Sequence, residues 1–161
     1  EAAMLVENGQ SGAAQLHLES AFQEQPDHQE ASLALASILA QNGDAKRARE
    51  LVTPWQSVPA AQRILSQLAL QDSAGDHDQA ELEAALAADD SNARAHYALG
   101  CLLAAKGDWE PALEHLLASV RLDRTIDDDG ARLRLIDAFN LLGPESPLTQ
   151  NYRRKLGQVL F

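Results

Sequence analysis

The chain has 161 residues, about one ordinary domain, and a domain of that size buries roughly 68–70% of its unfolded surface. Hydrophobic residues make up 45% of the chain but aromatic residues only 4%, so most apolar side chains are Ala and Leu, which favours helices over a sandwich or barrel of strands. The 13 basic and 24 acidic side chains give a formal net charge of −11, which argues against binding to nucleic acid or to an anionic membrane surface.

Apolar periodicity and helix-capping residues predict helices and no strand along the whole chain. The expected helices lie, in chain order, at residues 1–8, 11–24, 28–41, 45–54, 59–71, 77–88, 92–105, 109–121, 130–142 and 147–160. Several of them end at a glycine, the residue that most easily closes a helix in the left-handed conformation. No apolar run approaches the roughly 18 residues of a membrane span.

The helix pairs repeat along the chain. Three turns share one pattern: a helix rich in Ala and Leu, then a Gly, then an Ala five residues further on. The pairs are Gly9 with Ala14, Gly43 with Ala48, and Gly107 with Ala112. Gly9 and Gly43 are 34 residues apart, whereas Gly43 and Gly107 are 64 apart, which is two repeats with four residues missing. The turn of this irregular repeat is expected at residues 73–75. Alanine at the repeated position lets the two helices of a hairpin approach closely.

This pattern resembles the tetratricopeptide repeat, a helix–turn–helix unit of 34 residues. Within residues 93–126, the motif positions of that family are occupied by Leu99, Gly100, Leu103, Gly107, Trp109, Ala112 and Leu116. Arg124 stands where a typical repeat ends in Pro, and Trp55 and Ala60 break the ending of the second repeat. Glu1 falls on the seventh position of its repeat, so we expect the natural protein to continue N-terminally.

The predicted fold is therefore all-α: a solenoid of tetratricopeptide-repeat helical hairpins followed by an atypical C-terminal helix pair. The repeats are expected over residues 1–126, with the first truncated at its N-terminus and the third irregular. Residues 127–161 are expected to form the capping pair. An alternative is a set of unrelated helical hairpins that happen to share the glycine–alanine spacing.

The final predicted helix has clear start signals, because Ser146 can cap it and Pro147 occupies its first position. Its apolar stripe consists of Leu148, Tyr152, Leu156, Val159 and Leu160, and the helix before it has an apolar face formed by Leu135, Ile136, Phe139 and Leu142. The simplest expectation is that these two faces pack together. The acidic residues 127–129 are expected to cap the start of the earlier helix, since a calcium loop beginning there would need a glutamate where Ala138 stands.

No metal site, cofactor site or catalytic residue is predicted. The five histidines show no paired i, i+4 spacing on a helix, and His77 with its two acidic neighbours is expected in a solvated turn. Cys101 is the single cysteine, so an internal disulfide is excluded. The repeat register places Cys101 toward the concave surface with Arg94 as the one cation on that face, and an inert buried thiol is the simpler expectation.

The concave groove is the candidate protein-binding site. The register predicts that it is lined by Glu30, Leu33, Ser37, Ala40, Arg94, Tyr97, Cys101 and Ala104. These residues form a small, mostly apolar surface without the Lys and Asn side chains by which repeats of this family grip a terminal carboxylate. The groove therefore suits an apolar segment or another domain of the same chain better than an acidic tail. The alternative is that it is only a solvent-facing surface of small residues.

The last third of the chain has a more specific resemblance. The stretch Asp129-Gly130-Ala131-Arg132, the later Leu141-Leu142-Gly143, and the ending Asn151-Tyr152-Arg153-Arg154-Lys155-Leu156-Gly157-Gln158-Val159-Leu160-Phe161 resemble the C-terminus of the bacterial CnoX/YbbN family. Those proteins have a thioredoxin-like domain followed by tetratricopeptide repeats.

The resemblance implies a cytoplasmic, non-enzymatic chaperone, a holdase that binds unfolded clients and docks on the GroEL chaperonin through its C-terminal helix. The implied docking residues are Tyr152, Arg153, Arg154, Leu156, Leu160 and Phe161. Thiol chemistry would belong to the N-terminal thioredoxin-like domain, a further expected partner of the groove, so Cys101 inherits no redox role.

Two alternatives remain open at this point. One is a generic tetratricopeptide scaffold that binds one defined peptide or partner protein. The other is an enzyme, and only Cys101 and the scattered histidines support it.

Overall fold

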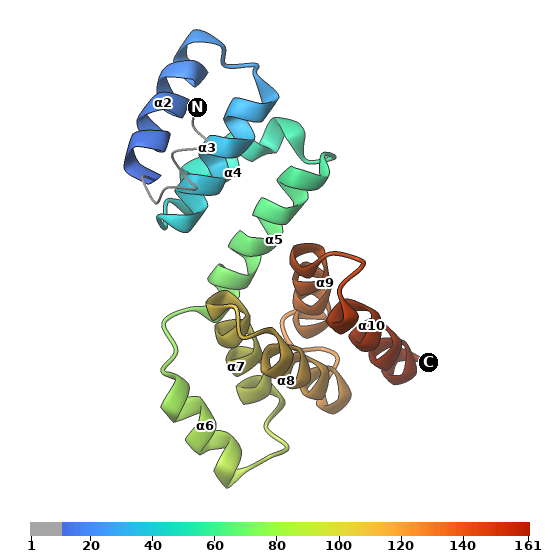
Figure 1. Ribbon diagram of the computed structural model, residues 1–161. Helices are drawn as coiled ribbons and strands as arrows, with labels where there is room; N and C mark the ends of the chain where they lie inside the picture. Colours follow the sequence, from blue (N-terminus) through green and yellow to red (C-terminus); the bar gives the residue numbers. More distant parts are fainter. Residues whose placement is uncertain (1–10) are drawn as a thin grey trace. The chain divides into compact units, whose positions relative to one another are not determined.

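The computed structural model describes residues 11–161, and every regular element in that range is helical (Figure 1). The elements are α2 (Ser11–Glu24), α3 (Gln29–Gln41), α4 (Ala45–Val52), the 3-10 turn η1 (Thr53–Trp55), α5 (Pro59–Ala74), α6 (Gln79–Ala88), α7 (Ala93–Lys106), α8 (Trp109–Leu122), α9 (Gly130–Leu142) and α10 (Pro147–Leu160). The all-α prediction is confirmed. The helix predicted over residues 1–8, with the first glycine turn at Gly9, lies outside the described residues.

The helix ends follow local capping chemistry. The side chains of His28, Asp44, Asp78 and Asn92 each accept a hydrogen bond from a backbone N–H three residues further on, at the start of α3, α4, α6 and α7. Gly43, Gly75 and Gly107 have φ values of +87°, +55° and +87°, so the three described glycine turns are confirmed. The turn of the irregular repeat lies later than expected, because α5 continues to Ala74 and residues 75–78 connect it to α6.

The chain divides within α5 into two compact units, residues 1–65 and 66–161. In the described part of the first unit, α3 packs against both α2 and α4. Its buried apolar side chains include Ala14, Leu18, Leu35, Ala36, Leu39, Ala48 and Val52. The predicted boundary at residue 126 lies inside the second unit.

The second unit is organised around the hairpin of α7 and α8, which have the most extensive contact of any described helix pair. Figure 1 shows the two helices side by side. One cluster joins Leu70 of α5 to Leu99 and Leu103 of α7, with Leu82 and Leu86 of α6 packed against it. The larger cluster draws on α7, α8, α9 and α10, so the C-terminal helix pair completes the core of this unit.

Gly100 makes the close approach of α7 to α8 possible. A Cβ atom at this position would lie 2.7 Å from Cγ of Leu116 and 3.0 Å from its backbone nitrogen. Leu116 itself is fully buried. The glycine of the Leu99-Gly100 motif therefore lets a small residue on α7 pack directly against a large residue on α8.

The C-terminal helices confirm most of the predicted apolar positions. Leu135 and Phe139 of α9 and Tyr152 and Leu156 of α10 are buried. Ile136 is the exception, because it stays partly exposed on α9. Figure 1 shows α10 alongside α9, and α10 also packs against α8.

Two capping predictions are wrong. Ser146 occupies the N-cap position of α10 but makes no side-chain capping bond there. Asp127, Asp128 and Asp129 all have φ between +46° and +69°, and Asp129 makes no capping bond to α9. An N-cap residue typically has an extended backbone, whereas Asp129 is left-handed. Asp129 instead forms an ion pair with Arg132.

Within residues 11–161, no helix combines the length and the apolar character needed to cross a lipid bilayer.

The Gly100 contact predicts a large effect from a small substitution. Gly100→Ala should destabilise the second unit by about 1–3 kcal/mol, because the new methyl group would overlap Leu116 and part of its backbone. Urea unfolding followed by circular dichroism measures this change.

Gly157→Ala is the matched control, since Gly157 lies in α10 and a Cβ there would meet no atom within 4 Å. It should stabilise the unit by up to about 1 kcal/mol through helix propensity alone. Equal effects of the two substitutions would contradict the close-contact explanation.

Candidate protein-binding site

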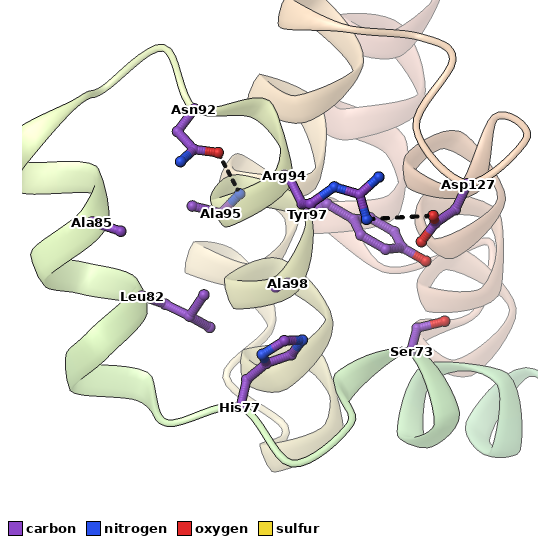
Figure 2. A pocket seen from close by; sticks show the side chains of 10 residues that line it. All are labelled: Ser73, His77, Leu82, Ala85, Asn92, Arg94, Ala95, Tyr97, Ala98 and Asp127. Carbon is purple, nitrogen blue, oxygen red and sulfur yellow. Dashed lines mark hydrogen bonds and ion pairs between the residues drawn. The ribbon is translucent and has the colours of Figure 1, made fainter.

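An open pocket of about 370 Å³ lies in the second unit between α6 and α7 (Figure 2). Its lining residues come from the end of α5, the turn after it, α6, the start of α7 and the loop before α9: Ser73, His77, Leu82, Ala85, Asn92, Arg94, Ala95, Tyr97, Ala98 and Asp127. The pocket is therefore built where one repeat meets the next.

The apolar surface of the pocket comes from two facing helices. Leu82 and Ala85 lie on α6, opposite Ala95 and Ala98 on α7 (Figure 2). Small side chains on both helices leave room between them. This surface suits an aliphatic side chain or a short apolar stretch of polypeptide.

Polar groups surround this apolar surface. The Asn92 side chain accepts a hydrogen bond from the Ala95 N–H at 3.0 Å, which fixes Asn92 at the first turn of α7. At the mouth, Nη1 of Arg94 lies 3.8 Å from Oδ1 of Asp127 (Figure 2). The two side chains are 73% and 49% exposed, so water screens this ion pair and it contributes little to stability. Arg94 is therefore available to an incoming acidic or carbonyl group.

Tyr97 forms the inner wall beside Asp127. It is almost fully buried, and burial raises the pKa of its phenol, with a smaller opposing effect from Ser73. A Cβ at position 130 would come within 3.2 Å of the Tyr97 hydroxyl, so Gly130 leaves the space that the ring needs. Tyr97 is thus a neutral and rigidly packed part of the pocket.

The predicted groove residues do not all line this pocket. Arg94 and Tyr97 do, whereas Ala104 borders a second hollow of about 260 Å³ near Lys106 and Trp109. Glu30, Leu33, Ser37 and Ala40 lie on α3 in the first unit, where Glu30 is exposed, Ser37 is partly exposed, and Leu33 and Ala40 are buried. The groove as a continuous surface stays a prediction.

The placement of Cys101 toward the concave surface needs a correction. Its side chain has no solvent exposure and packs in the core cluster with Leu135 and Ala138 of α9. Burial raises the pKa of the thiol to about 12, although Arg134 and Tyr97 act in the opposite direction. The cation with the strongest effect on this thiol is thus Arg134. The repeat register predicted Arg94 instead. An un-ionised buried thiol is a poor nucleophile.

The docking residues implied on α10 divide into an inner and an outer group. Tyr152, 1% exposed, and Leu156 are buried, and the Tyr152 hydroxyl donates a hydrogen bond to the Glu114 carboxylate on α8. Arg153 and Arg154 are exposed, and Phe161 is fully exposed.

Other contacts anchor α10. Nζ of Lys155 lies 2.7 Å from Oε1 of Glu114 and 4.3 Å from the centre of the Tyr152 ring. The Arg124 guanidinium donates to the backbone carbonyls of Val159 and Leu160 at the end of the helix. Leu160 is partly buried against the core.

Sequence reasoning missed one close pair of side chains. Nδ1 of His96 on α7 lies 2.9 Å from Nδ1 of His115 on α8. A search for i, i+4 spacing cannot find it, because the two residues lie on different helices. The signal was available in the hairpin itself, since residues at similar distances before and after the Gly107 turn lie opposite one another. Among the described residues, no group of three or more His, Cys, Asp or Glu side chains could hold a metal ion.

The burial of Cys101 predicts slow labelling in the native chain. Modification by a thiol reagent at pH 8 should be at least about a hundredfold slower than in guanidinium, because the thiol is both covered and un-ionised. Absorbance of the released chromophore measures the rate.

A double variant, Cys101→Ala with Ala105→Cys, gives the control, since Ala105 is an exposed position on the same helix. Its thiol should label rapidly in the native chain. Rapid native labelling of Cys101 would contradict the buried position.

Comparisons with known proteins agree with the repeat architecture. Two family models described as tetratricopeptide repeat match the chain, one over residues 72–161 and the other over residues 5–57. No curated protein matches the sequence.

Two solved structures are similar to the chain. One is a domain of protein VP0806, of unknown function, from Vibrio parahaemolyticus, with 22% identity and a TM-score of 0.45, covering 99% of this chain and 96% of that one. The other is a double mutant described as MamA RS-1 ArsTM, with 18% identity and a TM-score of 0.42, covering 99% and 90%. One of the two family models matches more than half of this chain's length. The chain therefore belongs to the tetratricopeptide-repeat family, whose repeats are scaffolds for protein–protein interaction.

Proposed function

We propose that this chain is the protein-binding repeat domain of a cytoplasmic thioredoxin-like co-chaperone. In this proposal it holds unfolded client proteins and docks on a GroEL-type chaperonin through α10, without catalysing a reaction. The resemblance of residues 151–161 to the CnoX/YbbN C-terminus suggested this role. The observation that carries it is the two-sided character of α10, which is anchored on one side and open on the other.

The anchored side fixes the position of the helix. Tyr152 and Lys155 both donate to the carboxylate of Glu114, so one acidic residue of α8 holds two consecutive turns of α10. These interactions lower the pKa of Glu114, the contact with Lys155 most strongly, so the carboxylate stays charged near neutral pH. A rigidly held helix loses little conformational entropy when a partner binds to its outer side.

The open side supplies the contacts that docking needs. Phe161 offers a fully exposed aromatic ring at the end of the chain described here, and Arg153 and Arg154 add two positive charges in a protein of net charge −11. The Arg153 guanidinium also lies 5.6 Å from the centre of the Phe139 ring. Aromatic and arginine side chains are enriched at the centres of protein interfaces, and local positive charge favours an acidic partner surface.

The pocket between α6 and α7 supports the client-binding half of the proposal. Its facing walls of Leu82, Ala85, Ala95 and Ala98 are apolar, and its mouth is open to solvent. Unfolded proteins expose apolar side chains in extended segments, which such a surface accepts without requiring one sequence.

The second candidate function is a scaffold that binds one defined peptide. It is favoured by the polar rim of the same pocket, where Asn92, Arg94 and Tyr97 offer directional contacts around the apolar walls. Directional polar groups give sequence specificity, whereas a holdase needs little of it.

The docking proposal predicts a loss of chaperonin binding from single changes on α10. Arg154→Glu and Phe161→Ala should each weaken binding to GroEL at least about tenfold, because each removes an exposed contact without touching the core. Biolayer interferometry on immobilised GroEL measures the affinity.

Arg63→Glu is the matched charge reversal, at an exposed position of α5 in the first unit, and it should bind like the unaltered chain. Deleting the whole helix is a poorer test, since it would expose the core that Tyr152 and Leu156 cover. Unchanged affinity of both α10 variants would reject the docking assignment.

The holdase proposal predicts broad suppression of aggregation. Light scattering of three unrelated heat-unfolding proteins should fall when the chain is added, and Ala85→Glu should reduce this protection because it places a charge in the apolar pocket.

Ala84→Glu adds the same charge at an exposed position of the same helix and should protect normally. A chain that protects none of the three proteins, yet binds one peptide tightly, would support the scaffold alternative.

A further inference from the structure

The hairpin of α7 and α8 holds two imidazole rings against each other. Their Nδ1 atoms are 2.9 Å apart, the ring centres are 5.1 Å apart, and the ring planes are inclined by 37°. Both side chains are partly exposed, so an ion in solution can reach them. Neither histidine lines the pocket or belongs to the docking side of α10.

A backbone carbonyl fixes the hydrogen arrangement of this pair. Nε2 of His96 lies 3.0 Å from the carbonyl oxygen of Asp90, which can only accept a hydrogen bond. In the neutral ring, the hydrogen is therefore on Nε2 and a lone pair is on Nδ1. His115 donates its Nδ1–H to that lone pair. An imidazole whose second nitrogen donates to a carbonyl is the usual arrangement of a metal-binding histidine.

The surroundings keep the rings ready to bind a cation. In the hydrogen-bonded arrangement above, each ring carries one hydrogen, and both side chains are only partly exposed. Glu83 of α6 and Glu114 of α8, the latter also paired with Lys155, lie close enough to His115 to act on it electrostatically. Neutral imidazole is the form that coordinates metals, and carboxylates close by favour a bound cation.

The separation of the two nitrogens matches one coordination geometry. With metal–nitrogen bonds of about 2.0–2.1 Å, two ligands at a right angle have their nitrogens about 2.9 Å apart, and two tetrahedral ligands about 3.3 Å apart. The observed 2.9 Å is the length of the hydrogen bond between the rings, and it equals the spacing of adjacent positions in a square plane or an octahedron, so an ion can replace the shared hydrogen with little change in that distance. Nickel and copper ions prefer such positions with imidazole ligands.

We propose that His96 and His115 bind one Ni²⁺ or Cu²⁺ ion through their two Nδ1 atoms, with water in the remaining positions. His115 first moves its hydrogen from Nδ1 to Nε2 by exchange with solvent, so both rings stay neutral and no net proton is released. Because one ligand lies on each helix, the ion would clamp α7 to α8. This site is independent of the proposed chaperone function.

Isothermal titration of the 161-residue chain with NiCl2 alone at pH 7.5 tests the proposal. The unaltered chain should bind one equivalent, and His96→Gln and His115→Gln should each weaken binding at least about tenfold, because each leaves a single imidazole. His17→Gln, at an exposed position of α2, should bind like the unaltered chain. Absence of binding, or undiminished binding by either variant of the pair, would overturn the proposal.

A second measurement uses the unaltered chain and so does not depend on the folding of variants. In a proton NMR titration, paramagnetic Ni²⁺ should broaden the ring signals of His96 and His115 together and before those of His17 and His28. The thermal midpoint should rise with Ni²⁺ and stay constant with Mg²⁺, which prefers oxygen ligands. Broadening that begins at another histidine would place the ion elsewhere and refute the assignment.

Discussion

The close contact between Gly100 and Leu116 is the constraint on which the second unit depends. Because Gly100 has no side chain, α7 can lie against the turn of α8 that carries Leu116. Leu113 and Leu117, beside Leu116 on α8, are fully buried in the cluster that α9 and α10 complete. A larger residue at position 100 would separate the helices and disturb every later contact of the unit. The hairpin that this contact permits holds His96 opposite His115, and its second helix packs against α10.

The features that could be predicted from the sequence are those set by local chemistry. Helix ends at Gly43 and Gly107 require a left-handed residue, and caps such as Asp78 and Asn92 act within three residues, so each leaves its signal in the sequence. Local chemistry gave a wrong prediction for the turn after Ile126, because three consecutive aspartates look like a helix cap in the sequence. Their backbone is left-handed instead, and Gly130 leaves room there for Asp127 and for the Tyr97 hydroxyl, which comes from another helix.

The candidate sites were harder to predict, because they depend on contacts between helices. The repeat register assigned Arg94, Tyr97 and Cys101 to one groove; Arg94 and Tyr97 line the pocket, whereas Cys101 is buried in the core. Cys101 is covered because α9 brings Leu135 and Ala138 against α7, and a register taken from one repeat contains no information about the next helix pair. The two sides of α10 were separable in the sequence, because Tyr152 and Leu156 belong to the predicted apolar stripe and Arg153 and Arg154 do not. The contacts of Tyr152 and Lys155 with Glu114 were not predictable, because Glu114 lies on α8.

The departure of the last repeat from its family pattern has a physical explanation. A typical repeat ends in Pro, which stops the helix because it lacks an N–H group. Here α8 ends at Leu122, and the capping residue Asp123 has an extended backbone. The next residue has a side chain that can make contacts of its own. Arg124 donates to the carbonyls of Val159 and Leu160, which no helical N–H can satisfy at the end of α10. Replacing Pro by Arg therefore keeps the helix stop and adds a tether that holds the C-terminal helix against the repeat before it.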